Sequence, residues 1–246
     1  MLNPGARLAL AGTRFTDVRH MATVESTNGA VAALARQGAP EGVVVVADHQ
    51  TAGRGRRGRT WDAPAGSSLL VSVLLRPPAA DAHLAGMATA LAAVQACAEV
   101  AGVAVALKWP NDLVLGDRKL GGILGEVVTA GDRAAVVVGL GLNVDWDAPL
   151  PPGAIDLRSA TGAVVDRAKL LVALLRALEE RCRQPAARIL TEYRSRCVTL
   201  GRPVRVELGR LAVSGTATAV DEQGRLVVDA GRERRVIAAG EVIHLR

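Results

Sequence analysis

Residues 53–61 read Gly-Arg-Gly-Arg-Arg-Gly-Arg-Thr-Trp, so that three glycines separate four arginines and no apolar residue interrupts them. Such a stretch has no apolar face that a helix or a strand could bury, and glycine weakens both elements. Ordering it costs on the order of 1–2 kcal/mol per residue in backbone entropy, whereas each charge-assisted hydrogen bond to an anion returns roughly 1.5–3 kcal/mol. We therefore predict a loop that is mobile by itself and folds over an anionic ligand.

Buried strands are predicted on both sides of this loop. Residues 42–49 include four consecutive valines and lead directly into Gln50. Residues 67–75 are mostly apolar and stop before Pro77 and Pro78. Apolar, β-branched runs that end at turn residues are typical of strands in a sheet core.

The remaining elements follow from the spacing of apolar residues and from capping residues. Helices are predicted over residues 29–36, 81–101, 167–182 and 188–196. Strands are predicted over residues 103–107, 113–115, 119–128 and 134–142. From about Leu200 short apolar runs alternate with turns, which indicates a five-stranded barrel of the SH3 type. We expect a first domain over residues 1–198 and a second over residues 199–246.

Composition favours a soluble cytoplasmic protein. Half of the 246 residues are apolar, and the three cysteines lack any metal-binding spacing, as in proteins of reducing compartments. The first twenty residues have no apolar signal-peptide core, and the apolar stretch over residues 84–98 is too short to cross a bilayer. We therefore expect no membrane association.

The net charge of +6 would suit nucleic acid, but four of the basic residues lie in the loop, which contains no acid. Subtracting them, 6 − 4, leaves +2 for the rest of the chain. Only 2% of the residues are aromatic, which gives few platforms for stacking bases. The charge pattern favours a small anionic ligand, and we expect no nucleic-acid partner.

A second candidate segment is Lys108-Trp109-Pro110-Asn111-Asp112, at the end of a predicted strand. Binding groups cluster at strand ends in α/β sheets. Asn111 and Asp112 can contact a nucleotide and hold a hard cation such as Mg²⁺. The alternative is an ordinary strand-end turn; we favour it for Trp109, which we place in the core, but not for Asp112.

Two further groups are weaker when taken singly. Lys119 precedes Gly121-Gly122, and glycines inside a strand indicate close approach of another group. The alternative is an exposed hairpin lysine. Ser26-Thr27-Asn28 could serve only as a helix cap, and Gln50 could simply be solvated.

Together these residues resemble the biotin protein ligase family, in order along residues 23–145. The motifs that carry the resemblance are Gly53 to Arg59 with Trp61, Lys108 to Asp112, Lys119 to Leu124, Ser26 to Asn28, and Gly139 to Asn143. The resemblance implies an α+β fold: a mixed central sheet with flanking helices, of the class II synthetase-like biotin/lipoate ligase type, and a C-terminal SH3-like barrel.

The same resemblance implies an ATP-dependent ligase. Biotin and ATP would form biotinyl-5′-AMP and pyrophosphate, and a lysine of a biotin carboxyl carrier domain would then take the biotinyl group and release AMP. Some family members carry an N-terminal helix-turn-helix domain. Because only 25 residues precede Ser26, we expect the monofunctional type without operator binding.

By carry-over, the resemblance assigns roles to particular residues. The biotin-binding set is Ser26, Thr27, Asn28, Gln50, Arg54, Gly55, Arg56 and Lys119. The set for ATP and the adenylate is Arg54, Arg56, Arg57, Trp61, Lys108, Asn111, Asn143, Glu241 and Arg246. The catalytic set is Lys119, Arg56 and Asp112, of which Asp112 would also hold Mg²⁺. Residues 146–157 have no clear match, so whether Trp146, Ile155 or neither covers the adenine stays open.

Two other functions compete with this interpretation. A lipoate ligase performs the same chemistry on a related fold, but its apolar dithiolane does not need the polar group of Ser26, Thr27, Asn28 and Gln50. A non-enzymatic RNA-binding protein could use the arginine loop and the barrel, but it leaves Lys119 and Asp112 without a role.

Overall fold

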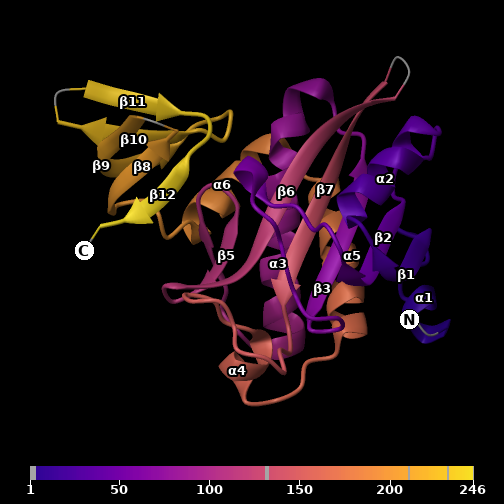
Figure 1. Ribbon diagram of the computed structural model, residues 1–246. Coiled ribbons are helices and arrows are strands. Elements are labelled where there is room, and N and C mark those ends of the chain that lie inside the picture. The colour runs from indigo at the N-terminus through magenta and orange to yellow at the C-terminus, as the bar shows by residue number, and fades with distance from the viewer. Residues whose placement is uncertain (1–3, 131–132, 210, 232, 246) are drawn as a thin grey trace.

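The computed structural model describes residues 4–130, 133–209, 211–231 and 233–245, which form two β-sheets and their covering helices (Figure 1). The larger sheet has the strand order β1-β2-β3-β7-β6-β5-β4. Only β1 and β2 pair in parallel, and the other neighbours are antiparallel, so the sheet is mixed as predicted. Its strands are β1 (Val18–Val24), β2 (Val44–Gln50), β3 (Ser68–Leu75), β4 (Ala106–Lys108), β5 (Asp112–Leu115), β6 (Arg118–Ala130) and β7 (Arg133–Asn143).

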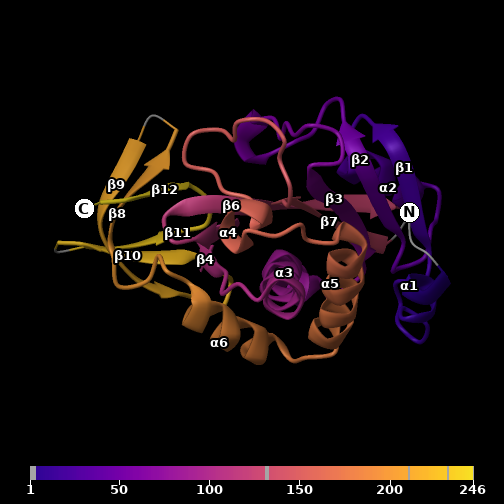
Figure 2. The same ribbon diagram turned by 90° about the horizontal axis from the view of Figure 1, so that it is seen from below.

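Helices α3 (Ala85–Ala101), α5 (Arg167–Cys182) and α6 (Ala186–Arg196) cover one face of this sheet (Figure 2). Alanine is the commonest residue of α3, and small side chains let it pack against both the sheet and α5, so that its first thirteen residues are nearly all buried. It ends at Gly102, whose φ of +67° is a left-handed C-cap. The core therefore lies between α3, α5 and the strands.

The helix predicted over residues 81–101 differs at its start. The structure has a 3₁₀ helix, η2 (Ala79–Leu84), before α3 begins at Ala85. By length and composition the span Ala79–Ala101 could cross a membrane, but 67% of its most apolar window is buried inside the protein. That burial identifies it as a core helix.

The other face of the sheet carries α2 (Thr27–Arg36) and the arginine loop. Ser26 is the N-cap of α2, and its hydroxyl accepts a hydrogen bond from the backbone N–H of Gly29. A second, smaller apolar cluster packs α2 onto β2, β3, β6 and β7. The arginine loop of residues 53–61 lies over the rest of this face of the sheet, away from α2.

The smaller sheet lies beside the β4–β5 edge of the central sheet, and the N-terminal segment lies at the opposite, β1 edge (Figure 1). All its pairs are antiparallel in the order β11-β10-β9-β8-β12. This five-stranded arrangement confirms the predicted C-terminal fold. Its strands are β8 (Pro203–Leu208), β9 (Leu211–Val220), β10 (Leu226–Ala230), β11 (Glu233–Ile237) and β12 (Glu241–His244).

Trp109 joins the two sheets from the core. It is 2% exposed, its backbone N–H donates to the hydroxyl of Thr199, and its indole N–H donates to the carbonyl of Gly224 at 2.9 Å. The interpretation of Trp109 as a core residue is therefore confirmed.

Three elements were not predicted: β1, α1 (Pro4–Leu8) and α4 (Leu157–Thr161). Strand β1 is at the sheet edge and most of its residues are exposed or half-exposed, so it lacks the apolar run by which β2 and β3 are recognised. The two helices are only five residues long, too short for a helical period to show.

Candidate active site

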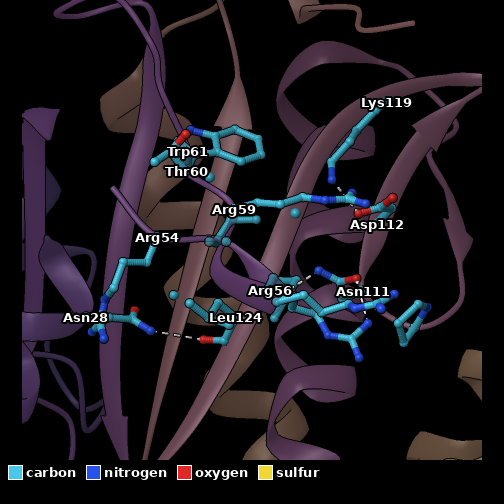
Figure 3. Close-up of a pocket in the computed structure, with 18 of the residues that line it drawn as sticks. Asn28, Arg54, Arg56, Arg59, Thr60, Trp61, Asn111, Asp112, Lys119 and Leu124 are labelled. Atoms are coloured by element: carbon cyan, nitrogen blue, oxygen red, sulfur yellow. Dashed lines mark hydrogen bonds and ion pairs between the residues drawn. The ribbon is translucent and has the colours of Figure 1, made fainter. Parts of the chain in front are cut away.

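A cavity of about 150 Å³ opens between the arginine loop and the uncovered face of the central sheet (Figure 3). Its walls come from the start of α2, the end of β2, the loop, the β4–β5 turn, β6, β7 and the smaller sheet. The predicted site residues that line it are Ser26, Thr27, Asn28, Gln50, Arg54, Gly55, Arg56, Arg57, Trp61, Lys108, Asn111, Asp112, Lys119 and Glu241.

Short polar side chains form one end of the cavity, which we call the polar end: Ser26, Thr27, Asn28 and Gln50, with the buried Ser72 in contact with Thr27 and Asn28. The oxygen of Gln50 accepts hydrogen bonds from the backbone N–H of Thr27 at 2.8 Å and from its hydroxyl at 3.0 Å. Ser72 lies 2.8 Å from the hydroxyl of Thr27 and donates to the amide oxygen of Asn28 at 2.6 Å. Thr27, Asn28 and Ser72 are buried and Gln50 is half-buried, so their partners are fixed by the fold.

The loop closes on itself over the sheet. Arg54 and Thr60 form an isolated antiparallel bridge, and the backbone N–H of Gly55 donates to the carbonyl of Arg59 at 2.7 Å. Gly53 is required here, because a Cβ at its position would lie 2.2 Å from the carbonyl oxygen of Trp61. Contrary to the expectation that no regular element would form, the loop includes one 3₁₀ turn, η1 (Arg56–Gly58).

The arginines of the loop contact protein oxygens, and they were expected to contact only a ligand. Arg54 forms two parallel 3.1 Å contacts with the carboxylate of Glu126 on β6. Arg56 donates to the amide oxygen of Asn111 at 3.3 Å (Figure 3). Arg57 donates to the carbonyl of Glu207 in the smaller sheet, and Arg59 forms an ion pair with Glu241. The loop thus bridges the two sheets, and its contacts with protein oxygens restrain its motion.

Arg56 is the loop arginine most enclosed by the protein. Burial lowers its pKa below the ordinary guanidinium value, and the neighbouring charges of Arg57 and Arg59 act in the same direction, while the Asp112 carboxylate opposes them. A guanidinium still keeps its proton at neutral pH. Arg56 therefore places a poorly hydrated positive charge in the cavity, which strengthens its attraction for an anion.

The indole of Trp61 rests on a surface of glycines. A Cβ at Gly141 would lie 2.5 Å from the indole, and one at Gly122 would lie 3.4 Å from it. Gly141 on β7 must stay without a side chain for Trp61 to reach the sheet, whereas a Cβ at Gly122 on β6 would be in ordinary contact with the ring. Among the residues that the structure describes, the buried indole nitrogen of Trp61 has no hydrogen-bond partner.

At the other end of the cavity, which we call the cationic end, Lys119 lies 2.6 Å from the Asp112 carboxylate (Figure 3). The register of the pairing between β5 and β6 shifts between Leu113 and Val114, which marks a β-bulge beside Lys119. The backbone of Lys119 is also held, since its N–H donates to Gly153 and its carbonyl accepts from Ile155. Strand β6 is thus held on both sides at this position. The Lys119 ammonium lies 5.9 Å from the centre of the Trp61 ring.

One predicted residue that the structure describes, Asn143, does not line the cavity. Asn143 ends β7, is 4% exposed, and donates to the carbonyl of Ile155 without lining the cavity. Its role toward an adenylate stays a prediction, although its buried amide oxygen has no partner in the described part of the chain. Arg246 lies outside the described residues.

The open segment of residues 146–157 packs beside the site. Trp146 donates its indole N–H to the hydroxyl of Ser68, and Ile155 is buried in the core. Neither lines the 150 Å³ cavity. Asp156 caps α4, and although burial alone would raise its pKa, hydrogen bonds from Ser159 and Trp146 hold that pKa below its usual value.

Sequence reasoning missed two residues of the polar end, Ser72 and Glu126. Ser72 is fully buried on β3, and Glu126 on β6 contacts both Asn28 and Arg54. The available signal was a polar residue inside an apolar strand: Ser72 interrupts Leu-Val-Ser-Val-Leu, and Glu126 follows the Gly-Ile-Leu-Gly segment.

Comparison with known families gives two matches. Residues 21–143 match the model of the biotin/lipoate A/B protein ligase family, and residues 199–245 match the biotin protein ligase C-terminal domain. The first match spans all the lining segments outside the smaller sheet, and the second spans the sheet that receives Arg57 and Arg59.

Known proteins are similar to this chain in sequence or structure over most of its length. The biotin–[acetyl-CoA-carboxylase] ligase of Mycobacterium tuberculosis is 40% identical over 96% of this chain and 92% of its own length. The bifunctional ligase/repressor BirA of Bacillus subtilis is 32% identical over 89% of this chain and 71% of its own length. A biotin protein ligase from Aquifex aeolicus, solved in complex with biotin and ATP, superposes with a TM-score of 0.79 at 26% identity and covers 94% of this chain and 100% of its own.

Proposed function

The chain belongs to the biotin protein ligase family, and we propose that it joins biotin to a lysine of a biotin carboxyl carrier domain through biotinyl-5′-AMP. The observation that carries this proposal is a single cavity with two chemically different ends. The polar end suits an uncharged ring with both donors and acceptors, and the cationic end suits a carboxylate and phosphates.

At the polar end, Ser26, Thr27, Asn28 and Gln50 are the proposed contacts of the ureido ring. A cyclic urea presents two N–H donors and one carbonyl acceptor, and amides and hydroxyls can match both kinds. The apolar ring of lipoate could not use the donors and acceptors that remain free here, at a cost of about 1–3 kcal/mol for each polar group left unsatisfied under the ligand. The polar end therefore favours biotin over lipoate.

At the cationic end, the first step joins a biotin carboxylate oxygen to the α-phosphorus of ATP while the bond to pyrophosphate breaks. Negative charge grows on the oxygens around that phosphorus, and Lys119 and Arg56 line the cavity where it would develop. Arg54, Arg57 and Lys108 add positive charge to the same wall, and Asn111 offers an amide for the nucleotide.

In the second step, the lysine nitrogen of the carrier forms a C–N bond with the biotinyl carbon, the C–O bond to phosphate breaks, AMP leaves, and a proton is lost from the nitrogen. Adenylation supplies the leaving group that a free carboxylate lacks. The loop would exclude water and so protect the anhydride from hydrolysis.

Mg²⁺ would be held by Asp112. In the described residues no group of three or more histidine, cysteine, aspartate or glutamate side chains could hold a metal alone. One carboxylate beside phosphate-binding cations nevertheless fits Mg²⁺, which commonly uses one or two carboxylates together with substrate phosphates and water. When bound, the ion would neutralise phosphate charge.

The remaining assignments extend this proposal. We divide the chain into a catalytic domain, residues 1–198, and a C-terminal domain, residues 199–246, which supplies Glu241 to the cavity. The acceptor is a carrier domain of a biotin-dependent carboxylase. A cytoplasmic location and the absence of a nucleic-acid partner stay predictions.

The experiment is to incubate purified protein with ATP, Mg²⁺ and either biotin or lipoate, and to measure pyrophosphate release and the mass of an added carrier domain. We expect pyrophosphate with biotin and a biotinylated carrier lysine. Pyrophosphate with lipoate only would identify a lipoate ligase. No release with either acid, together with RNA binding of steep salt dependence, would overturn the enzymatic proposal.

A further inference from the structure

Glu126 connects the polar end of the cavity to the arginine loop. Its carboxylate oxygen Oε2 accepts a 2.6 Å hydrogen bond from the amide nitrogen of Asn28, and both of its oxygens contact the guanidinium of Arg54 at 3.1 Å. The Glu126 side chain is 31% exposed, whereas Asn28 is 4% exposed. One half-buried carboxylate thus holds a buried amide and a loop arginine at once.

An ionised carboxylate can only accept hydrogen bonds, and this decides which way the Asn28 amide faces. The amide nitrogen must point to Glu126, where it also donates to the carbonyl of Leu124 at 3.2 Å (Figure 3). The amide oxygen must then face Ser72, which donates to it at 2.6 Å. Such amide orientations are assigned from their partners, and here every partner agrees.

The orientation of Asn28 sets the direction of the neighbouring hydrogen bonds. Because Ser72 gives its only proton to Asn28, the single hydroxyl proton of Thr27 can go either to Ser72 or to Gln50. Gln50 is fixed separately, since its oxygen accepts the backbone N–H of Thr27 and its nitrogen therefore remains a donor. Among the groups that the polar end offers a ligand are an acceptor, the second lone pair of the Asn28 oxygen, and a donor, the Gln50 nitrogen.

We propose that Glu126 is the positioning residue that fixes this donor and acceptor arrangement, and that it makes the polar end selective for a ring bearing an N–H beside a carbonyl. Through Arg54 the same carboxylate ties ligand recognition to the position of the loop. The inference rests on the proposed function for the identity of the ring, which would be the ureido ring of biotin.

Replacing Glu126 with glutamine weakens the constraint, because only the 3.2 Å contact with the Leu124 carbonyl then requires the Asn28 nitrogen on this side. The glutamine amide can donate as well as accept, so Asn28 can turn over and present its nitrogen to Ser72. The charge that holds Arg54 is lost at the same time. Glu126→Gln should raise the Kd for biotin about tenfold to a hundredfold, the effect of losing one charge-assisted hydrogen bond. The KM for biotin should rise while the KM for ATP changes little.

Glu41→Gln is the matched control. Glu41 is 32% exposed, pairs with Arg14 at 2.9 Å, and is not among the residues that line the cavity. It should lower thermal stability to a similar extent as Glu126→Gln but leave the Kd for biotin unchanged. Calorimetry with biotin alone measures the Kd of the two variants, and thermal unfolding compares their stability. If the two variants bind biotin equally, Glu126 has only a structural role.

A double-mutant cycle separates orientation from simple loss of charge. Ser72→Ala removes the donor that faces the Asn28 oxygen, so its effect on biotin binding should be non-additive with that of Glu126→Gln. Glu126→Asp, which keeps the charge with a shorter reach, should bind with intermediate affinity and serves if the glutamine variant does not fold. Additive effects in the cycle would overturn the inference. Absence of biotin binding by the wild type would instead overturn the proposed function.

Discussion

The two ends of the cavity are built in different ways. At the polar end the side chains are short, come from α2, β2 and β3, and are almost completely buried, as for Thr27 and Ser72. At the cationic end they are long and half-exposed: the Lys119 side chain is 40% exposed and that of Arg59 is 61% exposed. Lys119 pairs with Asp112 at the start of β5, and Arg59 pairs with Glu241 of the smaller sheet.

This difference matches the two tasks of the proposed reaction. Recognition of a rigid ring gains from groups that are already in place, because little entropy is then lost on binding. Activation and transfer need charges that can follow a reacting phosphate and a loop that admits the second substrate. Substitutions at the two ends should therefore change different steps, and the following predictions test this division in order of decreasing effect.

The largest effect is expected for Lys119→Ala. Removing a cation from the place where phosphate charge develops should slow pyrophosphate release about a hundredfold to a thousandfold. Biotin binding at the polar end should change much less. Lys169→Ala, at an exposed lysine of α5, is the control and should be fully active. Equal loss of biotin affinity and rate in Lys119→Ala would contradict the division into two ends.

Arg56→Gly should still form the adenylate but release it prematurely. The guanidinium holds Asn111 and lies enclosed under the loop, so its loss opens the cationic end. Release of labelled biotinyl-5′-AMP should accelerate about tenfold to a hundredfold, as expected for one lost charge-assisted contact. The rate of adenylate formation, which should also fall because Arg56 lies where phosphate charge develops, is measured separately. Retention as tight as in the wild type would remove the gating role of the loop.

Two glycines on β7 allow the ends to be disturbed separately. A Cβ at Gly139 would lie 2.1 Å from the Asn28 oxygen, whereas one at Gly141 would lie 2.5 Å from the Trp61 ring. Gly139→Ala should weaken biotin binding and Gly141→Ala should weaken adenylate retention, each about tenfold, since overpacking costs about 1–3 kcal/mol. Gly125→Ala, on β6 with nothing within 4 Å of its Cβ position, is the control. Calorimetry and adenylate release should rank the three variants differently.

The smallest effect is expected for Glu241→Gln, which removes the ion pair between the smaller sheet and Arg59. Exposed ion pairs contribute about 0.2–1 kcal/mol, so adenylate release should accelerate only about twofold to fivefold. High salt should reproduce the effect in the wild type and add nothing in the variant. A salt response of the same size in both proteins would show that this contact does not hold the loop.

Local patterns in the sequence were sufficient for most of the fold. The helix over residues 167–182 and the buried strands β2, β3 and β7 agree with their predicted positions within a residue or two. The edge strand β1 was missed, because at an edge the apolar pattern that marks a strand is weak. The predicted site included the residues that lie in short motifs. It missed the residues that act on the site through a partner residue.

By itself the sequence determined the loop of residues 53–61, the family of the chain and the chemistry of the side chains, because composition and short spacing carry that information. Only the tertiary structure decided their partners. Glu126 meets Asn28 across 98 positions, and Arg59 meets Glu241 across 182. Such contacts depend on how strands are ordered and how sheets face one another, which no local pattern of residues specifies.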